Sequence, residues 1–281
     1  MSDSIRAELF KLRKRPTAWV LLATAVVLSQ IFGYLIPYLS YRTGDAQTVG
    51  GNVPRGDVLA STLPDQLVIN SIGGFPVFAG ALALVLGALM FGGEYGWGTV
   101  KTLLTQRPGR ISVLGGQLVA LGAALFVGVA VLFALSAASS LGIALAENQA
   151  ADWPTVTDLA AGFGAGWLVL AMWASLGAVL GVTLRSVALP IGLGVVWVLG
   201  IENLVSAMAG SVLTALRPLR DVLPGVNAGS LVGAVMPDRV IDPPPGVTSS
   251  VAEPRALLTL LCYLVVCAAV AAWTSHRRDV V

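Results

Sequence analysis

Charged residues, histidine and cysteine are all scarce in this chain of 281 residues. Only 11% of the residues are charged, whereas 56% are hydrophobic, and the formal net charge is +2. In soluble domains, roughly a quarter of all residues are charged. The shortage of charge therefore excludes an ordinary soluble domain. The net charge near zero gives no basis for nucleic acid as a partner.

The single histidine and the two cysteines leave few ligands for a metal ion or a haem. His276 lies near the C-terminus, so one chain cannot supply a pair of histidines. Cys262 and Cys267 lie five positions apart in the last apolar run, which places them on different sides of a helix. We therefore expect neither a metal site nor a structural disulfide in this chain.

Motifs of catalysis are also missing. The sequence contains no HExxH helix and no recognisable set of nucleophile and base. The glycine-rich residues 93–99 have Thr99 where a phosphate-binding loop needs a lysine, so we expect no ATP site and no cofactor in this chain. Few ionisable residues fall within the apolar runs, which argues against a proton-coupled carrier.

Six long apolar runs are present instead. A helix rises about 1.5 Å per residue, so about 20 apolar residues cross the ~30 Å hydrocarbon core of a bilayer. The predicted fold is therefore an all-α polytopic membrane protein, with residues 1–281 forming one transmembrane domain. The predicted spans are residues 17–39, 67–91, 111–146, 158–184, 187–209 and 256–273. The third run is longer than a bilayer requires, which predicts either a tilt or an extramembrane turn.

Lysine and arginine are distributed unevenly between the two sides of these spans. With the N-terminus inside, eleven of the 17 fall on the cytoplasmic side, although the outer loops are longer. The positive-inside rule then predicts that both termini are cytoplasmic. The scarcity of lysine beside arginine, with abundant alanine, valine and glycine, is typical of bacteria with G+C-rich genomes. The predicted location is the bacterial inner membrane.

Residues 1–16 have the pattern of a short surface helix. Ile5, Leu9 and Leu12 share one face. The basic residues that cover the other sides are Arg6, Lys11, Arg13 and Lys14. This pattern is typical of an amphipathic helix in the headgroup layer of membrane lipid, with Pro16 separating it from the first span. The alternative is that these charges only fix the orientation of the chain.

Residues 210–255 form the longest predicted outer loop. Apolar residues alternate there with Arg217 and Arg220, and Pro218 and Pro224 limit any helix to short pieces. Such segments lie at the membrane interface, or dip into the membrane where protein shields their backbone. The loop is either a lid at the outer exit or a simple connection.

A few polar residues fall within the predicted spans. Glu202 and Asn203 lie in the last third of the fifth span, where we expect water to reach Glu202. Asn70 lies near the outer end of the second span. Carboxylates within a membrane are costly and often functional. We therefore regard these three residues as possible contacts to a substrate or another subunit. The alternative for Asn70 is a hydrogen bond between helices.

The polar loop after the second span, residues 92–110, carries the most distinctive pattern. In order along the chain it holds Glu94, Gly98-Thr99, Leu103-Leu104, Pro108 and Arg110. Together with the basic N-terminal helix and the order of the spans, this pattern resembles the type-2 permeases of ATP-binding-cassette exporters over nearly the whole chain. Gln117 departs from the lysine that these permeases often have at that position.

The resemblance implies a transport subunit that is not itself an enzyme. Two copies of this chain, or one copy and a paralogous permease, would form the export pathway. A separate cytosolic ATPase would bind ATP and magnesium. The loop would form a cytoplasmic coupling helix in a groove of that ATPase, with Glu94, Gly98 and Lys101 on one face. Thr99 and Arg110 also match the family motif in this loop, and the resemblance implies that they too take part in coupling to the ATPase.

Two other functions are compatible with the residues. The first is a membrane anchor or assembly factor that transports nothing, which substrate-stimulated ATP turnover would exclude. The second is a polytopic membrane enzyme acting on lipid, for which Glu202 and Asn203 would have to line a cleft near the outer face. The apolar spans favour a hydrophobic or amphipathic cargo, although every membrane span is apolar.

Overall fold

The computed structural model describes residues 2–44, 53–96, 110–211, 213–236 and 243–277. All regular structure in these residues is helical. Six helical segments are long and apolar enough to cross a membrane, so the all-α polytopic fold predicted from the sequence is confirmed. These segments are Pro16–Thr43, Pro64–Gly93, Ser112–Ala146, Val156–Leu184, Ala188–Ala209 and Glu253–Thr274.

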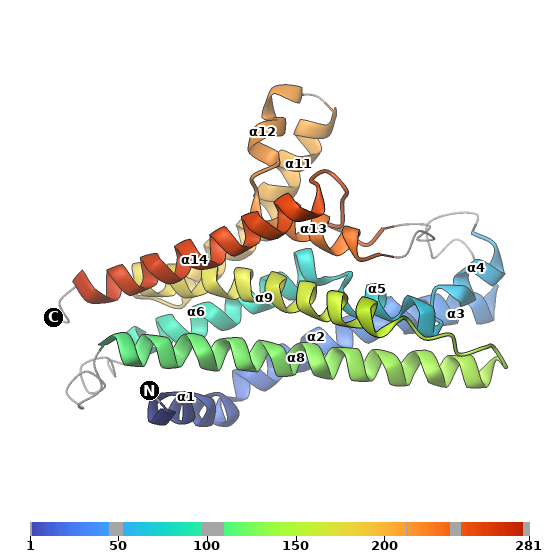
Figure 1. Ribbon diagram of the computed structural model, residues 1–281, viewed down its shortest axis with the longest axis horizontal. Helices are drawn as coiled ribbons and strands as arrows, with labels where there is room; N and C mark the ends of the chain where they lie inside the picture. The colour runs from blue at the N-terminus through green and yellow to red at the C-terminus, as the bar shows by residue number, and fades with distance from the viewer. Residues whose placement is uncertain (1, 45–52, 97–109, 212, 237–242, 278–281) are drawn as a thin grey trace.

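Three of the six spans consist of more than one helical element (Figure 1). Helix α1 (Ser2–Lys14) precedes the first span, which comprises α2 (Pro16–Gln30), η1 (Ile31–Leu35) and α3 (Ile36–Thr43). After α4 (Arg55–Ala60), the second span comprises η3 (Pro64–Gln66), α5 (Leu67–Ile72), η4 (Phe75–Ala79) and α6 (Gly80–Gly96).

The third and fourth spans are α8 (Arg110–Ala146) and α9 (Val156–Leu184). The fifth comprises α10 (Ala188–Val196), η5 (Trp197–Ile201) and α11 (Glu202–Ser211). The short elements η6 (Thr214–Leu216), α12 (Arg217–Arg220) and α13 (Pro224–Ala234) lead to the sixth span, α14 (Glu253–Arg277).

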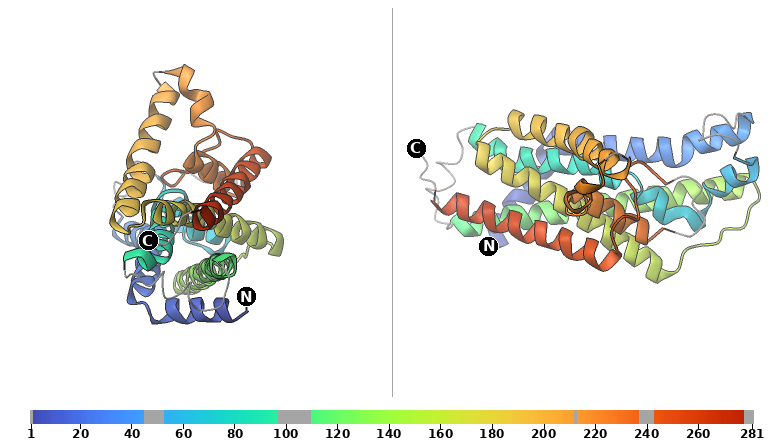
Figure 2. Two further views of the ribbon diagram at one scale, coloured as in Figure 1. Left: turned by 90° about the vertical axis from the view of Figure 1, so that its left-hand side faces the viewer. Right: turned by 90° about the horizontal axis from the view of Figure 1, so that it is seen from above.

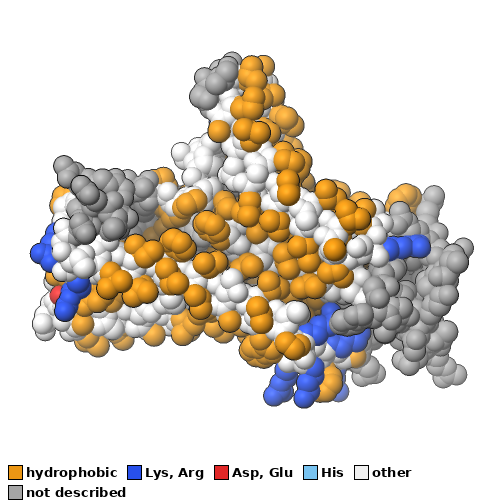
Figure 3. Space-filling view, turned by 180° about the vertical axis from the view of Figure 1, so that it is seen from behind, with side chains coloured by type: hydrophobic (Ala, Val, Ile, Leu, Met, Phe, Trp, Pro, Cys, Tyr) orange, Lys and Arg blue, Asp and Glu red, His pale blue; other side chains and the backbone are white. Residues whose placement is uncertain are grey.

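The long helices run side by side, and α1 lies across their common direction (Figures 1 and 2). The two ends of the chain lie toward the same end of this bundle, whereas α11 and α12 project from its side (Figure 1). On the face in Figure 3, hydrophobic side chains cover the middle of the molecule, and Lys and Arg gather toward its two ends. This distribution is what a membrane-spanning bundle requires.

Helix α8 is continuous over 37 residues, or about 56 Å. The structure describes the backbone throughout residues 110–146, and no turn interrupts it there. The extramembrane turn predicted as one of two alternatives for this run is therefore absent. A tilt, or an extension beyond the bilayer, accounts for the extra length.

One turn of π-helix interrupts the first, second and fifth spans. Pro76 lies within η4, and Pro37 follows η1 closely. Proline has no N–H and its ring crowds the preceding turn, so a helix widens around it. The turn η5 contains no proline. There the Asn203 side-chain amide donates to the carbonyl oxygens of Val198 at 3.0 Å and Leu199 at 3.1 Å.

Helices α6 and α9 pack backbone to backbone at the centre of the bundle. A Cβ atom on Gly177 would collide with the carbonyl oxygen of Leu84, and one on Gly87 would collide with the backbone of α9. Gly181 lies against Gly92 in the same way. Small residues stabilise helix pairs in lipid because they allow close van der Waals packing. In the second and fourth spans, 67% of the most apolar stretch is buried.

A polar cluster holds the first span to the third, at the end of the bundle remote from α1. Only 6% of the most apolar stretch of the first span is buried, so few apolar contacts hold it. The Glu147 carboxylate accepts hydrogen bonds from Tyr38 at 2.8 Å, Tyr41 at 3.2 Å and Arg42 at 3.3 Å. The hydrogen bond from Tyr38, supported by those from Arg42 and Tyr41, holds the pKa of Glu147 below its usual value.

We expect Gly177→Ala to destabilise the bundle, because its methyl group would meet the Leu84 carbonyl. Overpacking of a tight contact costs about 1–3 kcal/mol. Gly164 lies in the same helix with no neighbouring atom within 4 Å of its Cβ position, so Gly164→Ala is the matched control. It should be neutral or stabilising, because alanine favours a helix by about 1 kcal/mol. Thermal unfolding in detergent measures both effects, and equal unfolding temperatures would contradict the packing described.

We expect stability to fall as the pH is lowered through the folded-state pKa of Glu147. This pKa is lower in the folded than in the unfolded protein, so the ionised carboxylate stabilises the fold above the usual value of 4.5. Protonation at lower pH removes that contribution. Glu147→Gln should be less stable than the parent at about pH 7 and less sensitive to pH below about 5. Thermal unfolding across this range tests it; an unaltered pH profile in the variant would rule out this role.

Candidate functional site

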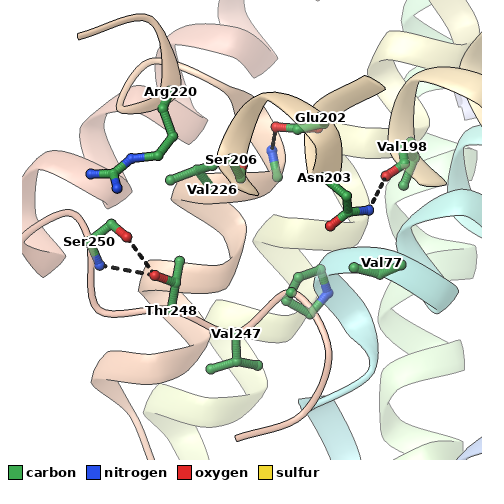
Figure 4. A pocket seen from close by; sticks show the side chains of 13 residues that line it. Val77, Val198, Glu202, Asn203, Ser206, Arg220, Val226, Val247, Thr248 and Ser250 are labelled. Atoms are coloured by element: carbon green, nitrogen blue, oxygen red, sulfur yellow. Dashed lines mark hydrogen bonds between the residues drawn. The ribbon is translucent and has the colours of Figure 1, made fainter. Parts of the chain in front are cut away.

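A pocket of about 180 Å³ lies where the fifth span meets α13 (Figure 4). Four segments that are distant in sequence form its wall. These segments are Pro76 and Val77 of η4, the junction of η5 with α11, the chain from Arg220 to the start of α13, and residues 246–250. The two π-helical turns therefore border the same cavity, in agreement with the frequent occurrence of such turns at functional sites.

Helix α13 forms one side of the pocket and is held by buried hydrogen bonds. Pro224 occupies its first turn, where the missing N–H costs nothing. The Asn227 side chain is fully buried and donates to the carbonyl oxygens of Asp221 at 3.0 Å and Leu223 at 2.7 Å. The N–H of Val251 donates to the Ser230 hydroxyl at 3.3 Å. Part of the predicted 210–255 loop is thus a helix buried in protein.

Glu202 faces the first turn of α13. Its side-chain oxygen Oε1 accepts a hydrogen bond from the Gly225 N–H at 2.5 Å. The first N–H groups of a helix lack partners within it and favour a negative charge. Glycine at position 225 permits the approach, because a Cβ atom there would lie 2.8 Å from the carboxylate carbon. Glu202 is only 4% exposed, so the expectation that water reaches it is wrong: α13 folds back and covers it.

The other polar groups of the pocket are mostly engaged with their neighbours. The side-chain nitrogen of Asn203 donates to the Val198 carbonyl oxygen in η5. The side-chain oxygen of Asn203 points away from Val198 (Figure 4). Arg220 forms an ion pair with Asp221, with Nη2 and Oδ1 2.7 Å apart. The hydroxyls of Thr248 and Ser250 lie 2.6 Å from each other.

Asn70 is not part of this pocket. Its side-chain amide donates to the carbonyl oxygen of Ser61 at 2.8 Å, in the turn that precedes α5. Its own carbonyl oxygen accepts a hydrogen bond from Ser29 of the first span at 3.4 Å. Asn70 therefore joins the first and second spans through its backbone, and the structure does not bring it together with Glu202 and Asn203.

The predicted surface helix is α1, which packs against α8. Leu12 is buried and Ile5 is half-buried, but Leu9 is 39% exposed. Glu8 takes a place on the buried side, where its carboxylate pairs with the Lys11 ammonium at 2.8 Å. The remaining basic residues of α1 are exposed: Arg6, Arg13 and Lys14.

Most of the predicted coupling loop lies outside the described residues. Gly98, Thr99 and Lys101 belong to the segment 97–109, which the structure does not describe. Glu94 lies in the last turn of α6, and Arg110 is the first residue of α8. The two residues therefore flank this segment.

Helix α1 contacts the helices on both sides of that segment. A nitrogen of the Arg15 guanidinium, just after α1, donates to the carbonyl oxygen of Leu89 in α6 at 3.4 Å. Ser4 packs against Gly116 in α8, where an added Cβ would lie 2.9 Å from that of Ser4. The end of α6 and the start of α8 are thereby linked to the N-terminal helix.

Sequence reasoning found Glu202 and Asn203 but missed the rest of the pocket. The prolines around residues 224 and 242–246 indicate turns, yet no sequence pattern connects those turns to η4. Among the described residues, no group of three or more His, Cys, Asp or Glu side chains could hold a metal ion. The described lining of the pocket combines hydrogen-bonding groups with apolar side chains.

Comparison with protein families gives a match to the family described as ABC-2 family transporter protein, over residues 4–280. Comparison with curated proteins gives no match. The family match covers nearly the whole chain, and the six apolar helices agree with a multi-pass membrane protein. This protein therefore belongs to the ABC-2 family of transporter proteins.

Proposed function

We propose that this chain is the permease subunit of an ATP-binding-cassette exporter and that a separate ATPase subunit drives it. The family match over residues 4–280 is the observation that carries the proposal. The family implies association with an ATPase of this class in general. The proposal further assigns export as the direction of transport. It also assigns two permease chains to one pathway, and residues 92–110 to the contact with the ATPase.

The end of the bundle that carries α1 is the side we assign to the cytoplasm. Helix α1, the end of α6, the start of α8 and the end of α14 all lie toward it (Figure 1). Arg6, Arg13 and Lys14 are exposed there. Positive charge of this kind is retained on the cytoplasmic side of membranes. We therefore propose a multi-pass protein of the bacterial inner membrane with both termini in the cytoplasm.

The segment between α6 and α8 is the proposed docking point for the ATPase. A movement of the ATPase against this segment would move α6 directly. Helix α9 would move with α6, because the two helices pack backbone to backbone at Gly87 and Gly177. It would also reach α1 through the contacts of Arg15 and Ser4. These connections support a mechanism in which ATP binding moves the α6–α9 pair and α1 together, opens the pathway outward, and hydrolysis resets it.

A second permease chain is the proposed neighbour of the fifth span. Helices α11 and α12 project from the side of the bundle (Figures 1 and 2). Their apolar side chains remain uncovered, with Leu204 61% and Leu219 55% exposed. A second copy of this chain, or a paralogous permease, would cover this projection and complete the pathway, and membrane lipid would cover the other outward faces.

We expect Glu94→Arg to uncouple the ATPase while the permease still folds and inserts. Reversal of charge at a docking face replaces an attraction with a repulsion, so permease-dependent ATP hydrolysis in reconstituted vesicles should fall by about tenfold or more. Glu253→Arg, at the exposed start of α14, is the charge-matched control and should keep full coupling. Normal transport and ATP turnover in Glu94→Arg would remove the coupling role from this residue.

A further inference from the structure

The side of α1 that points away from α8 carries a surplus of positive charge. Arg6 and Arg13 lie there, two helical turns or about 10 Å apart along the axis, and Lys14 is exposed beside them. Glu8, the one carboxylate among the described side chains of α1, is buried on the opposite side and paired with Lys11 at 2.8 Å. Its negative charge is therefore already compensated.

The exposed basic groups are not neutralised within the protein. Arg6, Arg13 and Lys14 form no ion pair with any residue that the structure describes. The Lys14 ammonium lies 5.7 Å from the centroid of the Phe10 ring, a cation–π contact that keeps it on this side without a counter-charge. Three uncompensated positive charges so close together attract an anionic partner.

Apolar side chains lie between these charges. Leu9 is 39% exposed and Phe10 is 62% exposed, and both fall between the two arginines on the same side of the helix. We call Arg6, Leu9, Phe10, Arg13 and Lys14 the outer face of α1. A helix binds to a bilayer surface through apolar side chains that enter the acyl boundary and basic ones that attract anionic lipid. The outer face of α1 supplies both.

A contact with the first span places this face at the depth of the lipid headgroups. The indole N–H of Trp19 donates to the carbonyl oxygen of Arg13 at 2.9 Å. Trp19 is 56% exposed and belongs to the first turn of the span Pro16–Thr43. Tryptophan at the end of a span lies at the membrane–water interface. Because α1 also lies across the bundle (Figure 2), its outer face meets lipid rather than the cytosol.

We propose that the outer face of α1 binds the headgroups of anionic phospholipids in the leaflet on its side of the membrane. The phosphate groups contact Arg6 and Arg13, because a guanidinium fork matches phosphate oxygens. Leu9 and Phe10 enter the acyl boundary between them. This binding does not depend on export or on an ATPase.

The first test compares two lipids on the unaltered full-length chain. Dioleoylphosphatidylglycerol and dioleoylphosphatidylcholine share their acyl chains and a phosphate, but only phosphatidylglycerol has a net negative charge. Each basic residue at an anionic surface strengthens binding by about fivefold, so phosphatidylglycerol should bind with a Kd lower by about tenfold or more. Native mass spectrometry of the permease, titrated in detergent, measures both. Equal affinities would leave these charges with the orientation role alone and overturn the proposal.

The second test removes two charges from the outer face of α1. Both arginines are exposed, and glutamine is nearly as good a helix former, so α1 should persist in Arg6→Gln/Arg13→Gln. Its affinity for phosphatidylglycerol should fall by about tenfold or more, with phosphatidylcholine binding unchanged. Arg6→Lys/Arg13→Lys keeps both charges and should retain most of the affinity.

A matched pair of substitutions controls for the loss of charge itself. Arg217→Gln/Arg255→Gln removes two exposed arginines that lie outside α1, and this variant should bind phosphatidylglycerol as the parent does. An equal loss of affinity in this control would overturn the proposal. Unchanged affinity in Arg6→Gln/Arg13→Gln would also overturn it.

An acidic surface of the ATPase is the alternative partner of this face. Co-purification of the ATPase with Arg6→Gln/Arg13→Gln separates the two. Retained ATPase with weakened phosphatidylglycerol binding supports the lipid site, whereas lost ATPase with unchanged lipid binding would overturn it. The lipid titrations contain no ATPase, so their failure leaves the proposed export function intact, and failure of the coupling experiment leaves the lipid result intact.

Discussion

The close approach of α6 and α9 is the contact on which the rest of this structure depends. Gly87 and Gly177 bring the two backbones together where any larger residue would collide. In lipid such packing, rather than hydrophobic burial, holds helices together. Helix α9 also carries α13 and α14 on its outer side, so the second, fourth and sixth spans share one frame. The first span is attached least tightly, because only 6% of its most apolar stretch is buried.

The pocket arises where the helices depart from regular geometry. Pro76 widens the second span, and the Asn203 amide satisfies carbonyl groups of η5. These two turns leave space beside the N-terminus of α13, and Glu202 crosses that space to the Gly225 amide. A carboxylate so placed stabilises the N-terminal end of a buried helix.

The spans were predictable from the sequence because the width of the bilayer sets the length of an apolar run. Residues 158–184, for example, correspond to the observed helix Val156–Leu184. The burial of Glu202 was not predictable, because it depends on α13 folding back from a turn more than twenty residues later. The π-helical turn η5 was likewise not predictable, because the Asn203 side chain of α11 bonds back to a carbonyl oxygen of that turn. The coupling roles of Gly98, Thr99 and Lys101 stay predictions, because these residues lie outside the described part of the chain.

The central claim is that this protein works as a pair of permeases driven by separate ATPase subunits. Native mass spectrometry of the tagged protein, purified from its own cell in mild detergent, tests that claim most directly. The account predicts a complex with two permease chains and one spanless P-loop ATPase for each of them. Repeated recovery of intact, monodisperse permease without an ATPase would contradict the account, and would favour a membrane anchor or a lipid-directed enzyme.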